Sequence, residues 1–166
     1  MTADTPLDLE QDLPFHRREW RVQRLAWILW GAVVLAALAG LVGPGPLSEQ
    51  TAASSDSRLL VEYDRFVHHH HPVTLQATMR PDEEDDSLRL HLSRGLLDDI
   101  KIERIEPQPE SEELDAGGTT YVFRCQPGEP TVKAVFHLEF EAMGNSSGEV
   151  QLSGSRPVLV KCFVYP

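Results

Sequence analysis

The chain has 166 residues, of which 41% are hydrophobic and 25% charged, and a net charge of −11. This length fits about one domain. The charge is divided unevenly: residues 1–43 contain five acids and four arginines (−1), so residues 44–166 carry the other 21 acids and 11 bases (−10). No Lys/Arg stripe runs through the acidic part. This argues against nucleic-acid binding, which needs clustered basic side chains to neutralise phosphates.

The N-terminal part predicts a tail followed by a membrane helix. Residues 1–14 are acidic and contain two prolines, which predicts a disordered tail. Residues 15–43 are expected to form a juxtamembrane and transmembrane helix, because Leu25–Gly43 contains no charge. Nineteen helical residues span about 28 Å, close to the bilayer core. A cleaved signal peptide is the alternative, although its apolar region is usually shorter, about 7–15 residues.

The basic residues beside the apolar run predict its orientation. Four arginines precede it closely: Arg17, Arg18, Arg21 and Arg24. The first basic residue after the run is Arg58. Arg and Lys near a span stay in the cytoplasm, so the N-terminus is predicted to lie inside and residues 44–166 outside.

Small residues recur within the predicted span. Ala32, Ala36 and Gly40 are four residues apart, so they share one helix face. Such a face lets two helices approach closely, which favours self-association or pairing with a larger membrane protein. The plainer interpretation is that alanine is simply common in membrane segments.

The prolines after the span predict its end. Gly43–Pro46 reads GPGP, which cannot continue a helix. Residues 44–57 are rich in Ser, Thr and Ala and are predicted to be a flexible linker. The ordered domain is therefore expected to cover residues 58–166.

These flanks carry a family resemblance. Phe15–Arg24 (FHRREWRVQR), a span that starts with Trp27, and Gly40–Ser48 (GLVGPGPLS) resemble a family of uncharacterised bacterial single-pass membrane proteins. Tyr63–Phe66, with Pro72 soon after, is similar to that family as well. The resemblance covers about the first 75 residues well. It implies a bacterial inner-membrane protein with a periplasmic domain and implies no activity.

The rest of the chain alternates apolar and polar residues, which predicts half-buried strands. Eight strands are expected, at about 59–67, 73–79, 88–92, 100–106, 119–125, 132–141, 148–153 and 158–165. Turns are expected between them, for example at 144–146, and a single helical turn at 94–99. The predicted fold is one transmembrane α-helix followed by an all-β antiparallel sandwich, with immunoglobulin-like topology as one option.

The two cysteines, Cys125 and Cys162, each end or lie within a predicted strand. The periplasm permits disulfides, so neighbouring strands would allow a bridge. The alternative is two buried thiols that behave as small apolar residues.

Consecutive histidines form the most visible motif: His68, His69, His70 and His71. Neutral imidazole binds Zn²⁺, Cu²⁺ or Ni²⁺. On a regular strand only alternate members share a face, so a closed site needs further ligands such as His91, His137 or a carboxylate. Exposed polyhistidine that binds metal only incidentally is the plainer interpretation.

Acidic residues concentrate in two stretches. Asp82–Asp86 has five consecutive acids without the spacing of a calcium loop, which favours a solvated turn. Residues 106–115 are expected to be a mobile loop. No hydrolase, phosphate-loop or zinc-protease motif occurs, so neither an enzyme nor a cofactor is predicted.

Three function hypotheses follow. The first is an anchored periplasmic interaction or structural module that partners another envelope protein or itself, besides the lipid bilayer. The second is a periplasmic metal-binding or metal-sensing protein built on His68–His71. The third, a module that binds a lipid or glycan, requires a pocket, which a sequence does not show.

Overall fold

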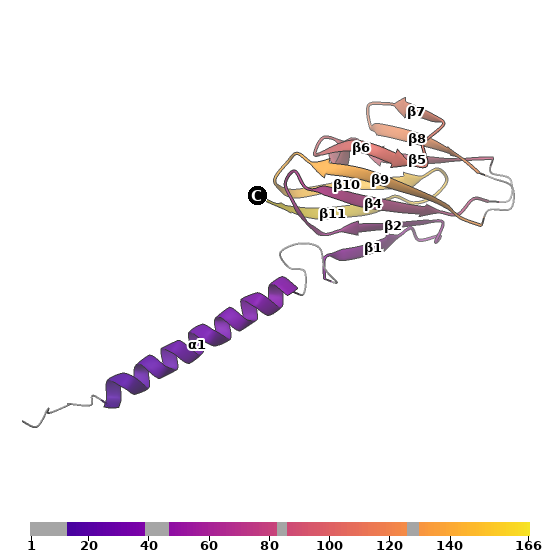
Figure 1. Ribbon diagram of the computed structural model, residues 1–166. Helices are drawn as coiled ribbons and strands as arrows, with labels where there is room; N and C mark the ends of the chain where they lie inside the picture. Colours follow the sequence, from indigo (N-terminus) through magenta and orange to yellow (C-terminus); the bar gives the residue numbers. More distant parts are fainter. Residues whose placement is uncertain (1–12, 39–46, 83–85, 126–129) are drawn as a thin grey trace, which may run out of the picture.

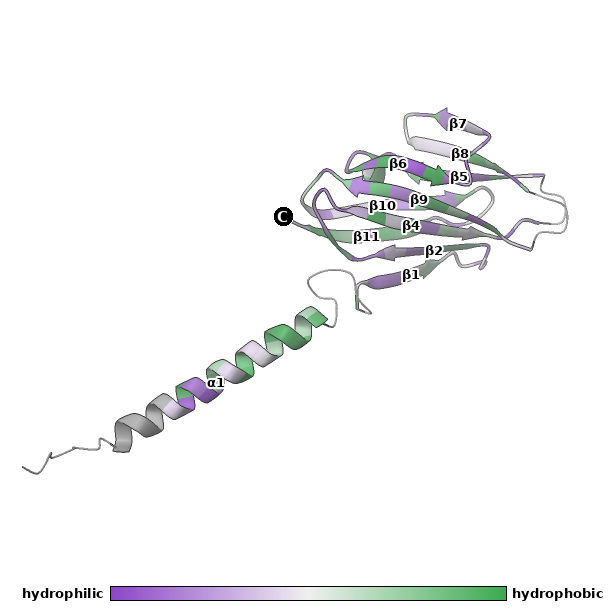
Figure 2. Ribbon diagram, viewed as in Figure 1, coloured by the Kyte–Doolittle hydropathy of each residue, from purple (hydrophilic) through white to green (hydrophobic). Residues whose placement is uncertain are grey.

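A computed structural model describes residues 13–38, 47–82, 86–125 and 130–166. It shows an N-terminal helix, α1 (Leu13–Leu38), followed by a β-sandwich, which confirms the predicted fold class (Figure 1). Within α1, Trp20–Leu38 is long and apolar enough to cross a membrane, and none of it is buried against the protein. In Figure 2 the C-terminal half of α1 is coloured mostly from white to green, toward the hydrophobic end of the scale.

Within these described ranges, eleven strands build the sandwich. They are β1 (Glu49–Ala53), β2 (Leu59–Asp64), β3 (Phe66–His68), β4 (Pro72–Met79), β5 (Ser87–Ser93), β6 (Ile100–Glu106), β7 (Ser111–Leu114), β8 (Gly118–Arg124), β9 (Val132–Phe140), β10 (Gly144–Leu152) and β11 (Val158–Tyr165). Sheet A has the order β1-β2-β4-β9-β6, and sheet B the order β3-β11-β10-β5-β8-β7. All pairs are antiparallel except the parallel pair β3–β11.

The core lies between the two sheets, where alternate residues of each strand meet. In β9 the inward side chains are Val132, Ala134, Phe136, Leu138 and Phe140, all buried. The ring of Phe136 packs edge-on against Tyr121 and Phe123 of the opposite sheet. This alternation is the pattern that predicted most of the strands.

A short helix closes one end of the core. The single helical turn expected at 94–99 is α2 (Arg94–Leu97), and its Leu96 is buried. The helix packs on β10 at Gly148, where a Cβ atom would lie 2.4 Å from the Cβ of Leu96. Only glycine leaves room for this contact.

The expected tail and linker are both partly wrong. Residues 13–14, assigned to the tail, belong to α1, while 1–12 lie outside the described residues. Strand β1 falls inside the expected linker 44–57 and pairs with β2. Its sequence, EQTAA, has no large apolar residue, so an edge strand went unrecognised.

Three other boundaries also differ from the prediction. The expected strand 59–67 breaks at Arg65, where the chain passes from β2 in sheet A to β3 in sheet B. The expected mobile loop 106–115 contains β7, whose residues are all exposed. The expected turn at 144–146 is already part of β10.

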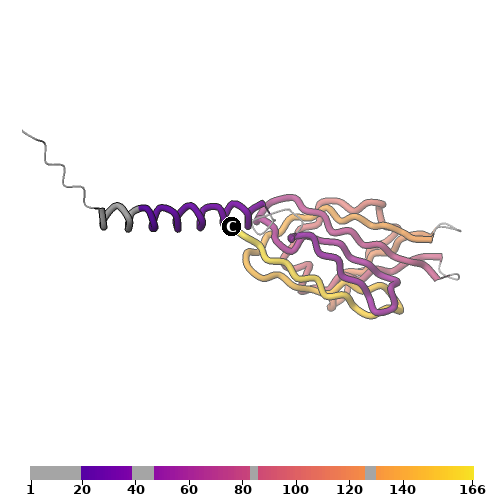
Figure 3. Tube along the Cα trace, turned by 90° about the horizontal axis from the view of Figure 1, so that it is seen from below, coloured from indigo at the N-terminus to yellow at the C-terminus, as the bar shows by residue number. Residues whose placement is uncertain are grey.

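The two ends of the sandwich are called here the proximal end and the distal end. At the proximal end, the chain arrives from α1 at Leu47–Ser48, and the C-terminus lies at the same end (Figures 1 and 3). The β1–β2 and β10–β11 turns lie at the distal end.

Candidate functional site

The open side of the sandwich between β6 and the β7–β8 pair carries a groove, called here the lateral groove. It consists of a hollow of about 570 Å³ and, toward the proximal end, a second of about 370 Å³, and Ile102 lines both. Leu97, Ile100 and Ile102 provide apolar lining in the second hollow. Beside them, Leu114 on β7 is 83% exposed. Apolar lining beside an exposed leucine is typical of a surface that contacts another molecule.

Edge strands and acidic groups frame the lateral groove. Strand β6 is the last strand of sheet A and β7 the last of sheet B. The β6–β9 register shifts between Ile102 and Arg104, which marks a bulge at Glu103. Glu103 and Glu112 both line the larger hollow. Burial, and next the charge of Glu112, raises the pKa of Tyr121, which keeps this phenol neutral.

A second depression, the proximal hollow, lies over β3, β10 and β11. Its volume is about 470 Å³, and its lining includes Arg65, Phe66, Asn145, Ser147, Lys161 and Phe163. Ser146 and Cys162 also contribute to this lining. The guanidinium of Arg65 lies 5.4 Å from the ring centroid of Phe66. Phe163, 38% exposed, packs edge-on against Tyr165 at 4.9 Å between centroids.

The histidine run does not form a strand face. His68 ends β3, while His69 and His70 form a turn with a positive φ of 55° at His70. The rings of His69 and His70 therefore lie together, 3.8 Å between centroids, instead of the expected alternate pairs. The Nδ1 atom of His70 lies 2.8 Å from Oε1 of Glu139, and the Nε2 atom of His69 lies 3.0 Å from the Glu141 carbonyl oxygen.

The other predicted metal ligands stay apart from this turn. The His91 ring nitrogen lies 3.1 Å from the Thr120 hydroxyl, and His137 lies 3.7 Å from Glu106. Within the described ranges, no three His, Cys, Asp or Glu residues are placed to hold a metal ion. The geometry of these residues thus gives the metal hypothesis no observation to rest on.

The Cys125–Cys162 disulfide, one of the two alternatives that the sequence left open, does not form. Cys125 follows β8 and bonds to Asp86 just before β5, whereas Cys162 pairs with Ser146 near the start of β10. In sheet B, strands β10 and β5 separate β11, which contains Cys162, from β8, after which Cys125 follows. Burial, and next the charge of Asp64, raises the pKa of the Cys162 thiol to about 12.

The residues predicted to act in the membrane lie on or beside α1. Arg17 and Arg18 belong to the helix, but their side chains are outside the described set. Arg21 follows one turn after, and the guanidinium of Arg24 lies 4.7 Å from the ring centroid of Trp20. Ala32 and Ala36 are helical and four residues apart, so they share a face, while Gly40 lies outside the described residues.

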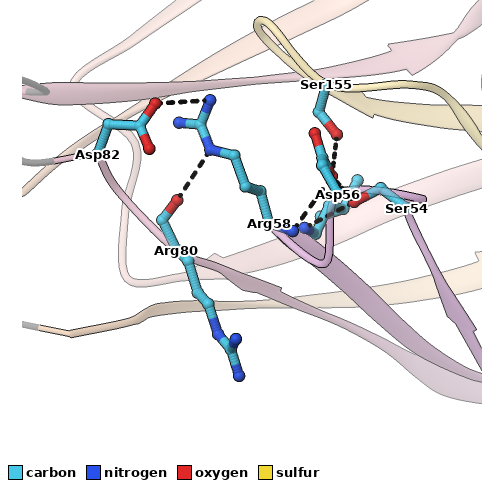
Figure 4. Close-up of polar contacts among 7 residues, drawn as sticks. Ser54, Asp56, Arg58, Arg80, Asp82 and Ser155 are labelled. Atoms are coloured by element: carbon cyan, nitrogen blue, oxygen red, sulfur yellow. Dashed lines mark hydrogen bonds and ion pairs between the residues drawn. The ribbon is translucent and has the colours of Figure 1, made fainter.

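The distal end is held together by its own polar groups (Figure 4). Asp56 accepts hydrogen bonds from the Ser54 hydroxyl, from the backbone N–H of Arg58 at 3.2 Å and from the Ser155 hydroxyl at 3.0 Å. These bonds, with that from Ser54 the largest cause, lower the pKa of Asp56 to about 2. Arg58 also pairs with Asp82 at 3.0 Å. Asp56 thus links the β1–β2 turn to the β10–β11 turn.

Part of the acidic run Asp82–Asp86 contributes an ion pair at the distal end. Asp82 is the partner of Arg58, while residues 83–85 lie outside the described part of the chain. The run therefore contributes to the structure through at least one ion pair. Its described residues, Asp82 and Asp86, are not placed in a group of three or more possible metal ligands.

Comparison with known proteins adds nothing to this geometry. No family model matches the chain, and no curated protein matches it. Sequence reasoning missed both depressions, and only Leu114 offered a signal, as an isolated apolar residue in an acidic stretch.

Proposed function

We propose that this protein is a membrane-anchored interaction module of the bacterial inner membrane. In this proposal α1 is an uncleaved single-pass anchor, the N-terminus is cytoplasmic and the sandwich is periplasmic. The exposed surface of Trp20–Leu38, which carries no charge after Arg24, supports the anchor, since such an apolar surface is stable in lipid and not in water. The proposal assigns binding to another envelope protein, and no catalysis.

The observation that carries the binding role is the exposed Leu114 beside the lateral groove. A leucine that is 83% exposed next to apolar lining is stabilised when a partner covers it. Strand β7 pairs on one side with β8 and is the last strand of its sheet, so its other edge can accept a further strand. The edge of β6 across the groove offers the same kind of backbone groups.

The occupant we assign is an extended periplasmic segment of an integral membrane protein. The larger hollow is lined by Glu103, Glu112 and Arg104, and Arg104 pairs with Glu106 at 2.8 Å. A segment with apolar residues interrupted by a basic residue complements the remaining acidic charge. The proximal part of the groove lies at the end where the chain arrives from α1, which supports a membrane protein as the partner.

Site-specific photo-crosslinking in membranes at native expression level tests this function. A photoreactive residue at Leu114 is expected to capture one defined membrane protein, whereas the same residue at distal Arg156 is not. With the photoreactive residue moved to Glu112, Leu114→Asp is expected to abolish the crosslink to that membrane protein. The variant chain is expected to stay in the membrane fraction. Equal capture at Leu114 and Arg156, capture of a second copy of the chain, or an unchanged crosslink in Leu114→Asp contradicts the proposal.

A further inference from the structure

The proximal hollow differs in charge from the rest of the sandwich. Residues 44–166 sum to −10, yet the described residues lining this hollow include the cations Arg65 and Lys161 and no carboxylate. Asn145 and Ser147 add an amide and a hydroxyl. Guanidinium, ammonium, amide and hydroxyl groups are the donors that bind phosphate oxygens.

A buried serine borders the hollow without facing it. Ser146 is 4% exposed, and its Oγ atom has no hydrogen-bond partner among the described residues. Buried and exposed residues alternate along β10, so this side chain lies on the opposite face of the strand from Asn145 and Ser147. The polar side chains open to a ligand in the hollow are therefore those of Arg65, Lys161, Asn145 and Ser147.

The chain length keeps this hollow within reach of the end of α1. Ser48 fixes the incoming chain against the wall of the hollow: its carbonyl accepts from the Arg65 N–H at 2.7 Å, and its hydroxyl accepts from the Phe66 N–H at 3.1 Å. Leu38, the last residue of α1, is ten residues earlier, so it lies within about 35 Å of Ser48 even if the chain is fully extended.

Aromatic rings complete the surface. Phe66, Phe163 and Tyr165 form one cluster, with 6.2 Å between the centroids of Phe66 and Tyr165 and 4.9 Å between those of Phe163 and Tyr165. The Tyr165 ring, with its own hydroxyl, is of the kind that favours the headgroup layer of a bilayer, and the two phenylalanines add apolar surface beside it.

We infer that the proximal hollow binds the phosphate of an anionic phospholipid headgroup in the leaflet from which the sandwich projects. This inference rests on the membrane anchoring of the proposed function, and not on its protein partner. Because the sandwich as a whole is acidic, an anionic surface repels it everywhere except at a local cationic site. Binding through the proximal hollow therefore fixes which side of the sandwich faces the membrane.

The test uses the full chain in nanodiscs of phosphatidylcholine, with or without phosphatidylglycerol, containing some lipid with a paramagnetic headgroup. Relaxation of the Phe163 amide by this headgroup is compared with that of Leu114, which is also near the proximal end but on the lateral groove. A domain that is only tethered relaxes similarly at both positions. We expect phosphatidylglycerol to raise the Phe163 enhancement about fivefold or more relative to Leu114.

Charge variants assign the effect to the hollow. Arg65→Glu with Lys161→Glu is expected to remove the difference between Phe163 and Leu114. Lys133→Glu with Arg156→Glu is the matched control, because it makes the same change of charge at exposed positions toward the distal end, and it is expected to preserve the difference. All four side chains are exposed, so the fold is expected to persist, which the amide spectrum verifies.

Each other outcome overturns the inference. Equal relaxation of Phe163 and Leu114 in both lipids, or no response to Arg65→Glu with Lys161→Glu, shows that the hollow does not bind headgroups. Inorganic phosphate is also added to discs of phosphatidylcholine alone. If it shifts the amide signals of the hollow as strongly as phosphatidylglycerol does, the hollow binds soluble phosphate and not a lipid headgroup. Failure of the chain to enter nanodiscs overturns the anchoring itself, whereas incorporation without headgroup contact overturns only this inference.

Discussion

The two ends of the sandwich use their polar groups in opposite ways. At the distal end, Ser54, Asp56 and Ser155 bond to one another and to backbone N–H groups. At the proximal end, the Ser146 hydroxyl is buried without a described partner. These described polar groups of the distal end bond to one partner or more within the protein, whereas at the proximal end Ser48 does so and Ser146 does not.

The difference separates stability from recognition. A closed polar network rigidifies the turns that it connects and leaves few groups for a ligand. Exposed apolar and cationic groups contribute little to folding, and they are retained where they contact another molecule. In this protein the exposed Leu114 lies on the lateral groove, and the exposed Phe163 lines the proximal hollow.

The largest expected effect comes from the core that both ends share. Phe136→Ala is expected to lower the free energy of unfolding by about 3–5 kcal/mol, because Phe136 is fully buried against Tyr121 and Phe123. Phe163→Ala at the proximal end is expected to cost about 1 kcal/mol or less, since that ring is 38% exposed. Urea unfolding of both variants measures the difference. Similar losses would show that Phe163 is a core residue and not a binding residue.

A smaller effect compares one substitution at the two ends. Ser54→Ala is expected to cost about 1–3 kcal/mol, because it removes the acceptor of the Leu59 N–H, at 3.0 Å, and a donor to Asp56. Ser146→Ala is expected to be neutral or slightly stabilising, since its buried hydroxyl has no described partner. Thermal unfolding distinguishes the two variants. A loss for Ser146→Ala that equals that for Ser54→Ala would erase the contrast between the ends.

The smallest expected effect is the acid dependence of the distal network. The folded-state pKa of Asp56, about 2, is below its unfolded value of about 4, so its contribution is complete above about pH 4. That contribution is lost as the pH falls from about 4 toward 2. Asp56→Asn is expected to flatten this part of the curve of urea midpoint against pH.

A proximal acid provides the control for this pH effect. Asp98 is an exposed carboxylate after α2. In Asp98→Asn, the urea midpoint is expected to fall between about pH 4 and 2 as it does in the unaltered protein. If Asp56→Asn and the unaltered protein lose stability in parallel between about pH 4 and 2, Asp56 does not link the distal turns energetically.

Most of the fold could be predicted because its signals are local. The apolar residues of α1 are continuous, and those of β9 alternate from Val132 to Phe140, so each pattern is visible in a short window. Strands β1 and β7 were missed because EQTAA and SEEL are polar edge strands without a buried face. Their pairing partners, and not their own composition, make them strands.

Sequence by itself determined the candidate membrane helix, the class of fold and the core positions, because hydrophobic periodicity is a property of neighbouring residues. The tertiary structure alone decided that Cys125 and Cys162 lie apart, that His69 and His70 form a turn, and that Arg65 and Lys161 line one hollow. These facts depend on strand order and register, which bring together residues nearly 100 positions apart through backbone pairing that composition does not encode.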